Sequence, residues 1–235
     1  GLILVSNLTV LLAMWASAGT IRDGFDDERL DGWKRNCVPN GGPCGLEDAE
    51  WVVTKGQPIV NESPLNAASF IAIGEVDCES YTVSVKTKIV KHQPVNGWNE
   101  AAGIILRYSS PVHFYFFGFG TFDLNPKGAY CLYMNGSTAV HHFELKPLEW
   151  KLNKWYQLKV EARGNRFKYY VDQKLIIDYK DKTFEKGQIG IYAGIHSVVV
   201  HYDDFMATGD QVPDLNLSVA SNSKLATTWG GLKLQ

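Results

Sequence analysis

Short runs of alternating apolar and polar residues, separated by tight turns, fill the segment from Trp155 to Thr208. Along Tyr156–Glu161 every second residue is apolar, which is the pattern of a half-buried strand. Gly164–Asn165 and Asp172–Gln173 supply two-residue turns, and glycine accepts the positive φ that such a turn needs. Because no helical period occurs in this segment, it predicts a series of antiparallel strands.

The same pattern of strands and turns runs through the earlier part of the chain. Tyr81–Val90 alternates, whereas Ala101–Tyr108 and His113–Phe119 are apolar on both faces, as central strands are. Asn135–Gly136 is a strong hairpin signal. Roughly twelve or more short strands without helices require two packed antiparallel sheets. We therefore predict an all-β, two-sheet sandwich over residues 19–209, with a linker and C-terminal tail over 210–235.

Residues 1–18 differ in composition from the rest of the chain. Leu8–Ala16 is apolar, and small residues follow it up to Ala18. This arrangement is typical of a signal peptide with cleavage after Ala18. The alternatives are a buried strand or a membrane anchor, but an anchor needs about 20 continuous apolar residues, and this run is shorter. We expect an exported protein, extracellular or periplasmic, whose mature chain has no membrane span.

Four cysteines fit an exported protein. Cys37 and Cys44 flank a loop rich in proline and glycine, which would bring their thiols within bonding range. Cys78 and Cys131 remain for a second, long-range bridge. An even number of cysteines in an exported chain favours disulfides over a metal site.

Charge excludes one class of partner. The chain has 23 Lys and Arg against 25 Asp and Glu, which gives a formal net charge of −2, and both signs are mixed along the sequence. Such a chain has no basic stripe for nucleic acid and no polybasic patch for a membrane surface. We therefore expect no nucleic-acid partner.

Several short motifs together resemble one superfamily. They are Gly24–Asp27, Gly32–Trp33, Ala102–Tyr108, Trp155–Val160, Gly187–Ile191 and Tyr202–Phe205. Their order is similar to that of the concanavalin A-like lectin/glucanase jelly roll, in its laminin-G-like and bacterial 3-keto-disaccharide hydrolase-like forms. The resemblance implies a secreted carbohydrate-binding or adhesion-type module. The same fold also includes glycoside hydrolases, so the fold alone does not determine the function.

A group of acidic residues is the strongest sign of an enzyme. Glu75, Asp77 and Glu79 resemble the Glu-x-Asp-x-Glu strand of laminarinase-type glycosidases, in which two carboxyl groups lie about 5–5.5 Å apart. In those enzymes the strand comes later, at the place that His113–Phe117 takes here without a carboxylate. We therefore predict binding rather than catalysis. A glycan-acting hydrolase of the 3-keto-disaccharide hydrolase or laminarinase-like type is the alternative.

A ligand-binding groove is predicted around Arg107, His113 and Tyr115, with Trp98 and Tyr133 at its rim. Sugar sites combine aromatic faces with planar polar groups, and an arginine is hard to place in a sealed core. We therefore assign the face that carries Arg107 to the concave side of the sandwich. The expected ligand is a polysaccharide or glycoconjugate.

Structural calcium is the one cofactor that the sequence suggests. Asp27 and Asp204 lie in acidic pairs near the first and last strands, which are neighbours in many domains of this fold. Carboxylates together with backbone carbonyls can hold Ca²⁺. The alternative is that both are solvated residues at strand ends.

Overall fold

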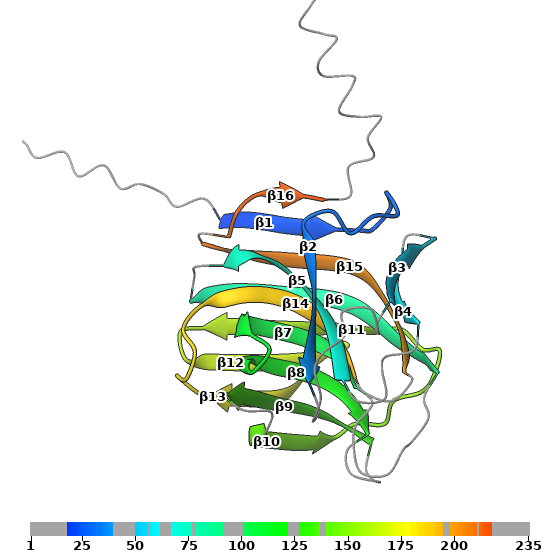
Figure 1. The fold of residues 1–235 in the computed structure, drawn as a ribbon. Coiled ribbons are helices and arrows are strands. Elements are labelled where there is room, and N and C mark those ends of the chain that lie inside the picture. Colours follow the sequence, from blue (N-terminus) through cyan, green and yellow to red (C-terminus); the bar gives the residue numbers. More distant parts are fainter. Residues whose placement is uncertain are drawn as a thin grey trace, which may run out of the picture.

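Two sheets packed face to face form the protein (Figure 1). The computed structural model describes residues 18–39, 50–55, 57–61, 67–76, 79–91, 101–121, 127–136, 140–194, 198–210 and 212–217. Over these residues every regular element is a strand. The predicted all-β, two-sheet antiparallel fold is therefore confirmed.

The larger sheet has nine strands among the described residues. Its order is β13 (Lys174–Lys180), β12 (Arg166–Val171), β11 (Tyr156–Arg163), β6 (Ser80–Lys91), β15 (Val199–Asp210), β1 (Ala18–Asp23) and β16 (Leu215–Asn216). The hairpin of β3 (Glu50–Thr54) and β4 (Gln57–Asn61) joins the sheet through β15. Its pairs are antiparallel except β1 with β16, which is parallel.

The smaller sheet has seven strands among the described residues, all paired antiparallel. Its order is β10 (Val140–Pro147), β9 (Lys127–Asn135), β8 (His113–Thr121), β7 (Ala101–Ser110), β14 (Gly187–Ala193), β5 (Ala67–Val76) and β2 (Trp33–Pro39).

The main core fills the space between the sheets. On β11 the inward positions are Tyr156, Leu158, Val160 and Ala162, as the sequence alternation predicts. A hydrogen bond also crosses the core, because the hydroxyl of Tyr202 on β15 accepts from Gly103 N on β7 at 3.0 Å. Burial of this apolar surface is the principal stabilising contribution.

A second apolar cluster lies on the opposite face of the seven-stranded sheet. Phe114 and Phe116 point to this face, while Tyr115, Phe117 and Phe119 on the same strand point into the main core. Every one of these side chains is aromatic, so no alternation of polar and apolar residues marks one face of β8 between its ends. The pairing of β8 with β7 and β9 determines the direction of each side chain.

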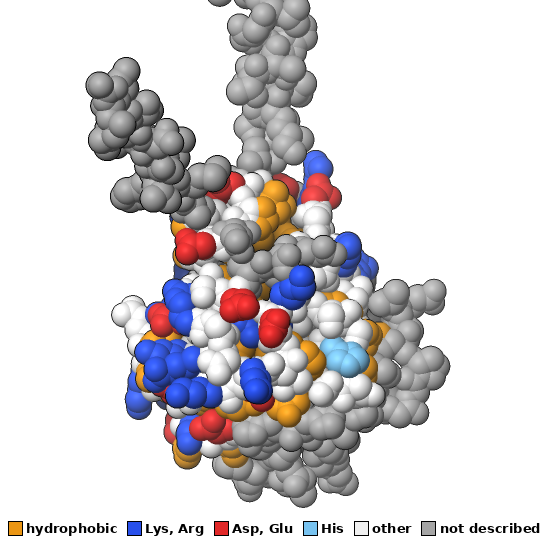
Figure 2. All heavy atoms as spheres, turned by 90° about the vertical axis from the view of Figure 1, so that its left-hand side faces the viewer, with side chains coloured by type: hydrophobic (Ala, Val, Ile, Leu, Met, Phe, Trp, Pro, Cys, Tyr) orange, Lys and Arg blue, Asp and Glu red, His pale blue; other side chains and the backbone are white. Residues whose placement is uncertain are grey.

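The ends of the chain are only partly described. Residues 1–17 and 218–235 lie outside the described residues, so the predicted leader stays a prediction. Beyond position 209, β15 runs through Asp210, and Val212 is buried. No helix in the described part of the chain is long and apolar enough to cross a membrane. Figure 2 shows acidic and basic side chains next to one another on the side of the molecule that is on the left in Figure 1.

The cysteines differ from their predicted pairing. Cys131 is a free, buried thiol, so the predicted Cys78–Cys131 bridge is wrong. Burial raises the pKa of this thiol to about 12, which keeps it protonated and unreactive. Cys37 is buried, whereas Cys44 and Cys78 lie outside the described residues, so the predicted Cys37–Cys44 bridge stays a prediction.

Candidate functional site

Arg107, the predicted centre of the groove, joins three separate segments inside the protein. Its guanidinium donates hydrogen bonds to Phe184 O at 2.5 Å, Gly164 O at 2.6 Å and Glu79 O at 3.2 Å. The same group lies 4.8 Å from the centre of the Phe167 ring, in cation–π contact. With 2% of its surface exposed, Arg107 is a buried structural residue.

A β-bulge turns this arginine inward. The register between β7 and β8 shifts between Leu106 and Ser110, and Arg107 has a φ of 53°. A Cβ at Gly187 would lie 2.6 Å from the carbonyl carbon of Arg107, so only glycine lets β14 approach the bulge this closely. Arg107 therefore does not share the face of Ile105, two positions before it. The prediction that it lines an open concave side is wrong.

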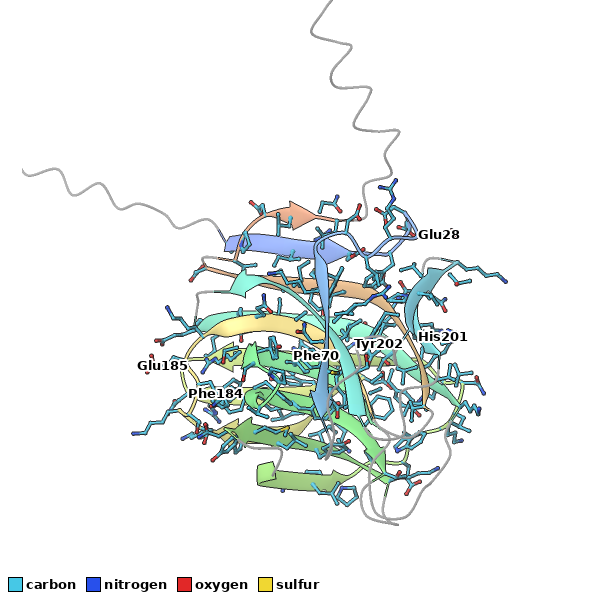
Figure 3. The ribbon with its side chains drawn as sticks, viewed as in Figure 1. Glu28, Phe70, Phe184, Glu185, His201 and Tyr202 are labelled. Atoms are coloured by element: carbon cyan, nitrogen blue, oxygen red, sulfur yellow. The ribbon has the colours of Figure 1, made fainter. Side chains whose placement is uncertain are left out.

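Phe184, which is labelled in Figure 3, lies between β13 and β14. Three of the other predicted ligand-binding residues lie around its ring. The rings of Tyr115, Tyr133 and His113 lie 5.1, 6.1 and 5.9 Å from that of Phe184. The Tyr115 hydroxyl donates to Asp181 and accepts a hydrogen bond from Phe184 N. Tyr115 is fully buried, so the structure brings these residues together around a packed phenylalanine and not around an open groove. Trp98 lies outside the described residues.

Polar groups in this cluster are paired with one another. Burial raises the pKa of Tyr115, and its hydrogen bond to Asp181 raises it further. For Asp181, burial acts to raise the pKa, but hydrogen bonds from Tyr115 and Thr183 outweigh it and leave the pKa below its usual value. The cluster therefore contains an ionised carboxylate that accepts internal hydrogen bonds.

The acidic motif is not a laminarinase-type strand. Glu75 lies in β5, which ends at Val76, whereas Glu79 stands directly before β6. Glu75 and Glu79 consequently do not share one strand. Glu79 is exposed, and its carbonyl oxygen binds Arg107. Asp77 lies outside the described residues.

Both predicted calcium ligands have protein partners. Asp27 accepts a hydrogen bond from Arg29 N at 3.1 Å, and Asp204 forms an ion pair with Lys86. Within the described ranges, no group of three or more His, Cys, Asp or Glu side chains is placed to hold a metal ion. The geometry therefore provides no support for the calcium prediction.

A pocket opens instead on the outer face of the nine-stranded sheet, and we call it the outer-face pocket. Its volume is about 490 Å³. The residues that line it come from β1, β6, β11, β15 and β16 and from the turn after β1: Arg22, Asp23, Gly24, Ser84, Gln157, Asp204, Phe205, Met206 and Asn216. Among these residues the sequence predicted a functional role only for Asp204, as a calcium ligand.

Strand register explains how these distant residues meet. Ser84, Met206, Arg22 and Asn216 are successive cross-strand partners on β6, β15, β1 and β16. The register shifts between Asp203 and Met206, where Asp204 has a φ of 48°. This bulge interrupts the regular ladder at the pocket wall. The available sequence signal was the run of polar residues at outward positions, but it does not show which strands are adjacent.

Asp23 is a buried carboxylate at the edge of the outer-face pocket. It accepts hydrogen bonds from Phe25 N at 2.8 Å and from Trp33 Nε1 at 2.7 Å. Burial raises the pKa of Asp23 to about 6; the two hydrogen bonds act against this shift, and the nearby Asp27 and Asp26 add to it. A carboxyl group with this pKa changes its charge close to neutral pH.

Comparison with known proteins places the chain among carbohydrate-related domains. The model of a family described as "3-keto-alpha-glucoside-1,2-lyase-like domain" matches residues 20–207. A segment of 57 residues is 44% identical to the levanase of Bacillus subtilis (strain 168). This segment makes up 24% of the chain but only 8% of the levanase.

Solved structures share the fold at low sequence identity. The carbohydrate-binding module CBM66 from Bacillus subtilis is 22% identical, with a TM-score of 0.55 over 76% of this chain and 96% of that module. A Bacillus licheniformis β-glucanase is 13% identical, with a TM-score of 0.56 over 81% and 98% of the two chains. Peanut lectin is 10% identical, with a TM-score of 0.58 over 82% and 98%. These likenesses confirm the predicted concanavalin A-like jelly roll.

Replacement of Arg107 by lysine tests its structural role. Lysine keeps the charge but loses the planar fork that reaches three carbonyl oxygens. We expect the free energy of unfolding to fall by about 2–4 kcal/mol, since a hydrogen bond to a charged group contributes about 1.5–3 kcal/mol. Urea denaturation measures this loss. The matched control is Arg166→Lys, at the exposed ion pair with Asp178, where we expect less than about 1 kcal/mol. Equal losses in the two variants would contradict the assignment.

The raised pKa of Asp23 predicts a pH dependence of stability. The folded state holds the proton more tightly than the unfolded state, whose pKa is near 3.8. The stabilisation that comes from the raised pKa of Asp23 is therefore complete below about pH 4 and is lost as the pH rises through about 6. Asp23→Asn removes this part of the slope, although its amide also loses one of the two accepted hydrogen bonds. Unfolding free energies measured from pH 4 to pH 7 in both proteins test this. An unchanged slope in the variant would refute it.

Proposed function

Because the chain belongs to the family of 3-keto-alpha-glucoside-1,2-lyase-like domains, we propose that it binds a carbohydrate in the outer-face pocket. Family membership and the fold shared with lectins and a carbohydrate-binding module support a sugar-related function. We propose this position for the binding site because hydrogen-bonding side chains from several strands line one pocket there. We further propose that binding, without catalysis, is the principal activity.

The chemistry of the pocket suits hydroxyl groups. Arg22, Gln157 and Asn216 offer planar donors or acceptors, and Ser84 offers a hydroxyl. A sugar ring carries hydroxyls that donate and accept at the same time, so a mixed set of partners can satisfy it. Small-molecule sites have volumes of about 300–1,000 Å³, and the pocket at about 490 Å³ lies in that range.

Local charge favours a neutral sugar. The acidic residues around the pocket are Asp23, Asp203 and Asp204, whereas the basic ones are Arg22 and Lys86. Lys86 is already paired with Asp204. A uronic acid or sulfated sugar would meet net repulsion there. We therefore propose a neutral polysaccharide, and levan is the first probe because the related levanase acts, by its name, on levan.

Export is part of the proposal. The apolar residues and the small residues that follow them up to Ala18 support it. So does the predicted disulfide between Cys37 and Cys44, since such bonds persist in oxidising compartments outside the cytoplasm. A polysaccharide-binding domain would meet its ligand there.

Binding to levan and to a soluble β-glucan tests the function. We expect Arg22→Ala and Gln157→Ala each to weaken binding about tenfold, because each removes hydrogen bonds with a net contribution of about 1–1.5 kcal/mol. Titration calorimetry and affinity electrophoresis measure the change. The matched control is Lys180→Ala, an exposed residue of β13 outside the pocket, which should bind normally. Failure of the wild-type protein to bind any neutral polysaccharide would overturn the function. Normal binding by both pocket variants would overturn the site.

One observation favours a second candidate, a glycan-cleaving enzyme. Asp23 is among the residues of the pocket, and its carboxyl group has a pKa of about 6, which suits a general base near neutral pH. On a 3-keto-α-glucoside, such a base would take the proton at C2, which the keto group acidifies. The electron pair left behind would form the C1–C2 double bond as the C1–O bond breaks. The leaving oxygen would take up the proton and depart as the alcohol.

Activity on a 3-keto-α-glucoside separates this candidate from simple binding. If the chain is an enzyme, we expect an enone absorbance to appear and alcohol to be released. The rate should fall by at least about a hundredfold in Asp23→Asn. Asp26→Asn, which leaves the carboxylate of Asp23 in place, is the control. Absence of product in the wild-type protein would rule out this reaction, and an unchanged rate in Asp23→Asn would exclude Asp23 as its base.

A further inference from the structure

The C-terminal segment Val212–Leu217 returns along the first strand of the larger sheet. Its short strand β16 lies beside β1 in Figure 1, at the end of that sheet. The pairing is parallel and places Leu215 opposite Ile21 and Asn216 opposite Arg22. Because the segment adds a strand at the open edge of β1, it is joined to the sheet on one side.

The two ends of this segment hold it in place. Val212 belongs to the main core and Leu217 packs against it, whereas the residues between them are exposed, Leu215 at 38%. Leu217 N donates to Arg22 O at 3.0 Å, Val212 N to Gly209 O at 3.2 Å, and Thr20 N to the Asp214 carboxylate at 2.8 Å. Segments with few buried apolar contacts open locally at a lower free-energy cost than central strands. The segment can therefore detach without unfolding the sandwich.

The same segment forms a wall of the outer-face pocket. Asn216 is a pocket residue, and its strand partner Arg22 is another. The backbone carbonyl of Arg22 also holds Leu217 N. When the segment is docked, Asn216 and Arg22 lie next to each other at the pocket. When it detaches, the pocket loses Asn216.

We propose that Val212–Leu217 is a strap coupled to the ligand: Asn216 contacts the bound sugar, and sugar binding and strap docking stabilise each other. The inference rests on the proposed function of the outer-face pocket. A ligand that touches Asn216 binds only the docked state at full strength, so it must shift the equilibrium towards docking. By the same linkage, a change that releases the strap weakens binding.

A substitution at Gly19 can release the strap without changing any residue of the pocket. A Cβ at this position would lie 1.6 Å from Val212 O, so Gly19→Ala pushes the segment away from β1. Asp214→Ala is a milder second variant, because it removes only the acceptor of Thr20 N. Leu215→Ala is the matched control, since this exposed side chain lies on the strap but outside the pocket.

The experiment measures amide hydrogen exchange at Leu217 and Thr20, and levan affinity, in the full chain. We expect levan to slow exchange at Leu217 in the wild-type protein. Gly19→Ala should speed exchange and weaken levan binding about tenfold, within the usual range of coupling between sites. Asp214→Ala should change both in the same direction but less, and Leu215→Ala should change neither. Asn216→Ala should weaken binding while exchange in the free protein stays as in the wild type.

The outcomes distinguish a failure of the strap proposal from a failure of the proposed function. Faster exchange in Gly19→Ala or Asp214→Ala with unchanged levan affinity overturns the strap and leaves the proposed function standing, provided that Arg22→Ala still weakens binding. Unchanged exchange at Leu217 on levan binding also overturns the coupling. If neither levan nor β-glucan binds in a way that depends on Arg22, the proposed function fails and the coupling fails with it.

Discussion

The buried guanidinium of Arg107 is the interaction on which the end of the sandwich depends. It joins the turn between β11 and β12, the start of β6 and the segment before β14 through three carbonyl oxygens. A buried charge without partners would be strongly destabilising, so the backbone around it has to take one arrangement. Gly187 permits that arrangement by leaving room for the bulge. Phe184 then packs among Tyr115, Tyr133 and His113 and fills the space.

Two bulges in this fold have opposite consequences. At Arg107, with a φ of 53°, the bulge in β7 turns a charged side chain inward, where protein groups satisfy it. At Asp204, with a φ of 48°, the bulge in β15 lies at the wall of the outer-face pocket. A bulge redirects side chains and ends regular pairing. The bulge at Arg107 therefore removes this side chain from the predicted groove. The bulge at Asp204 lies at a pocket that the sequence did not predict.

The pocket also shows why the fold by itself does not determine function. Lectins, a carbohydrate-binding module and a glucanase share this architecture. What differs among such proteins is the set of side chains that meet at one place. Here the set contains hydrogen-bonding groups suited to hydroxyls, together with Asp23, whose pKa of about 6 makes its charge sensitive to pH. In the two functions proposed, binding and proton transfer would depend on the same few residues.

The sequence by itself determined the class of fold, because alternation and turn residues are local properties. Tyr156–Glu161 alternates, and its apolar positions face the core. The sequence also identified residues that meet, since His113, Tyr115 and Tyr133 do gather, but it could not show that Phe184 fills the space between them. Tertiary structure alone decided which face of β8 is inside, where Arg107 points, and that Arg22, Ser84 and Asn216 line one pocket. These features depend on register and bulges between strands far apart in the chain, and no local pattern records them.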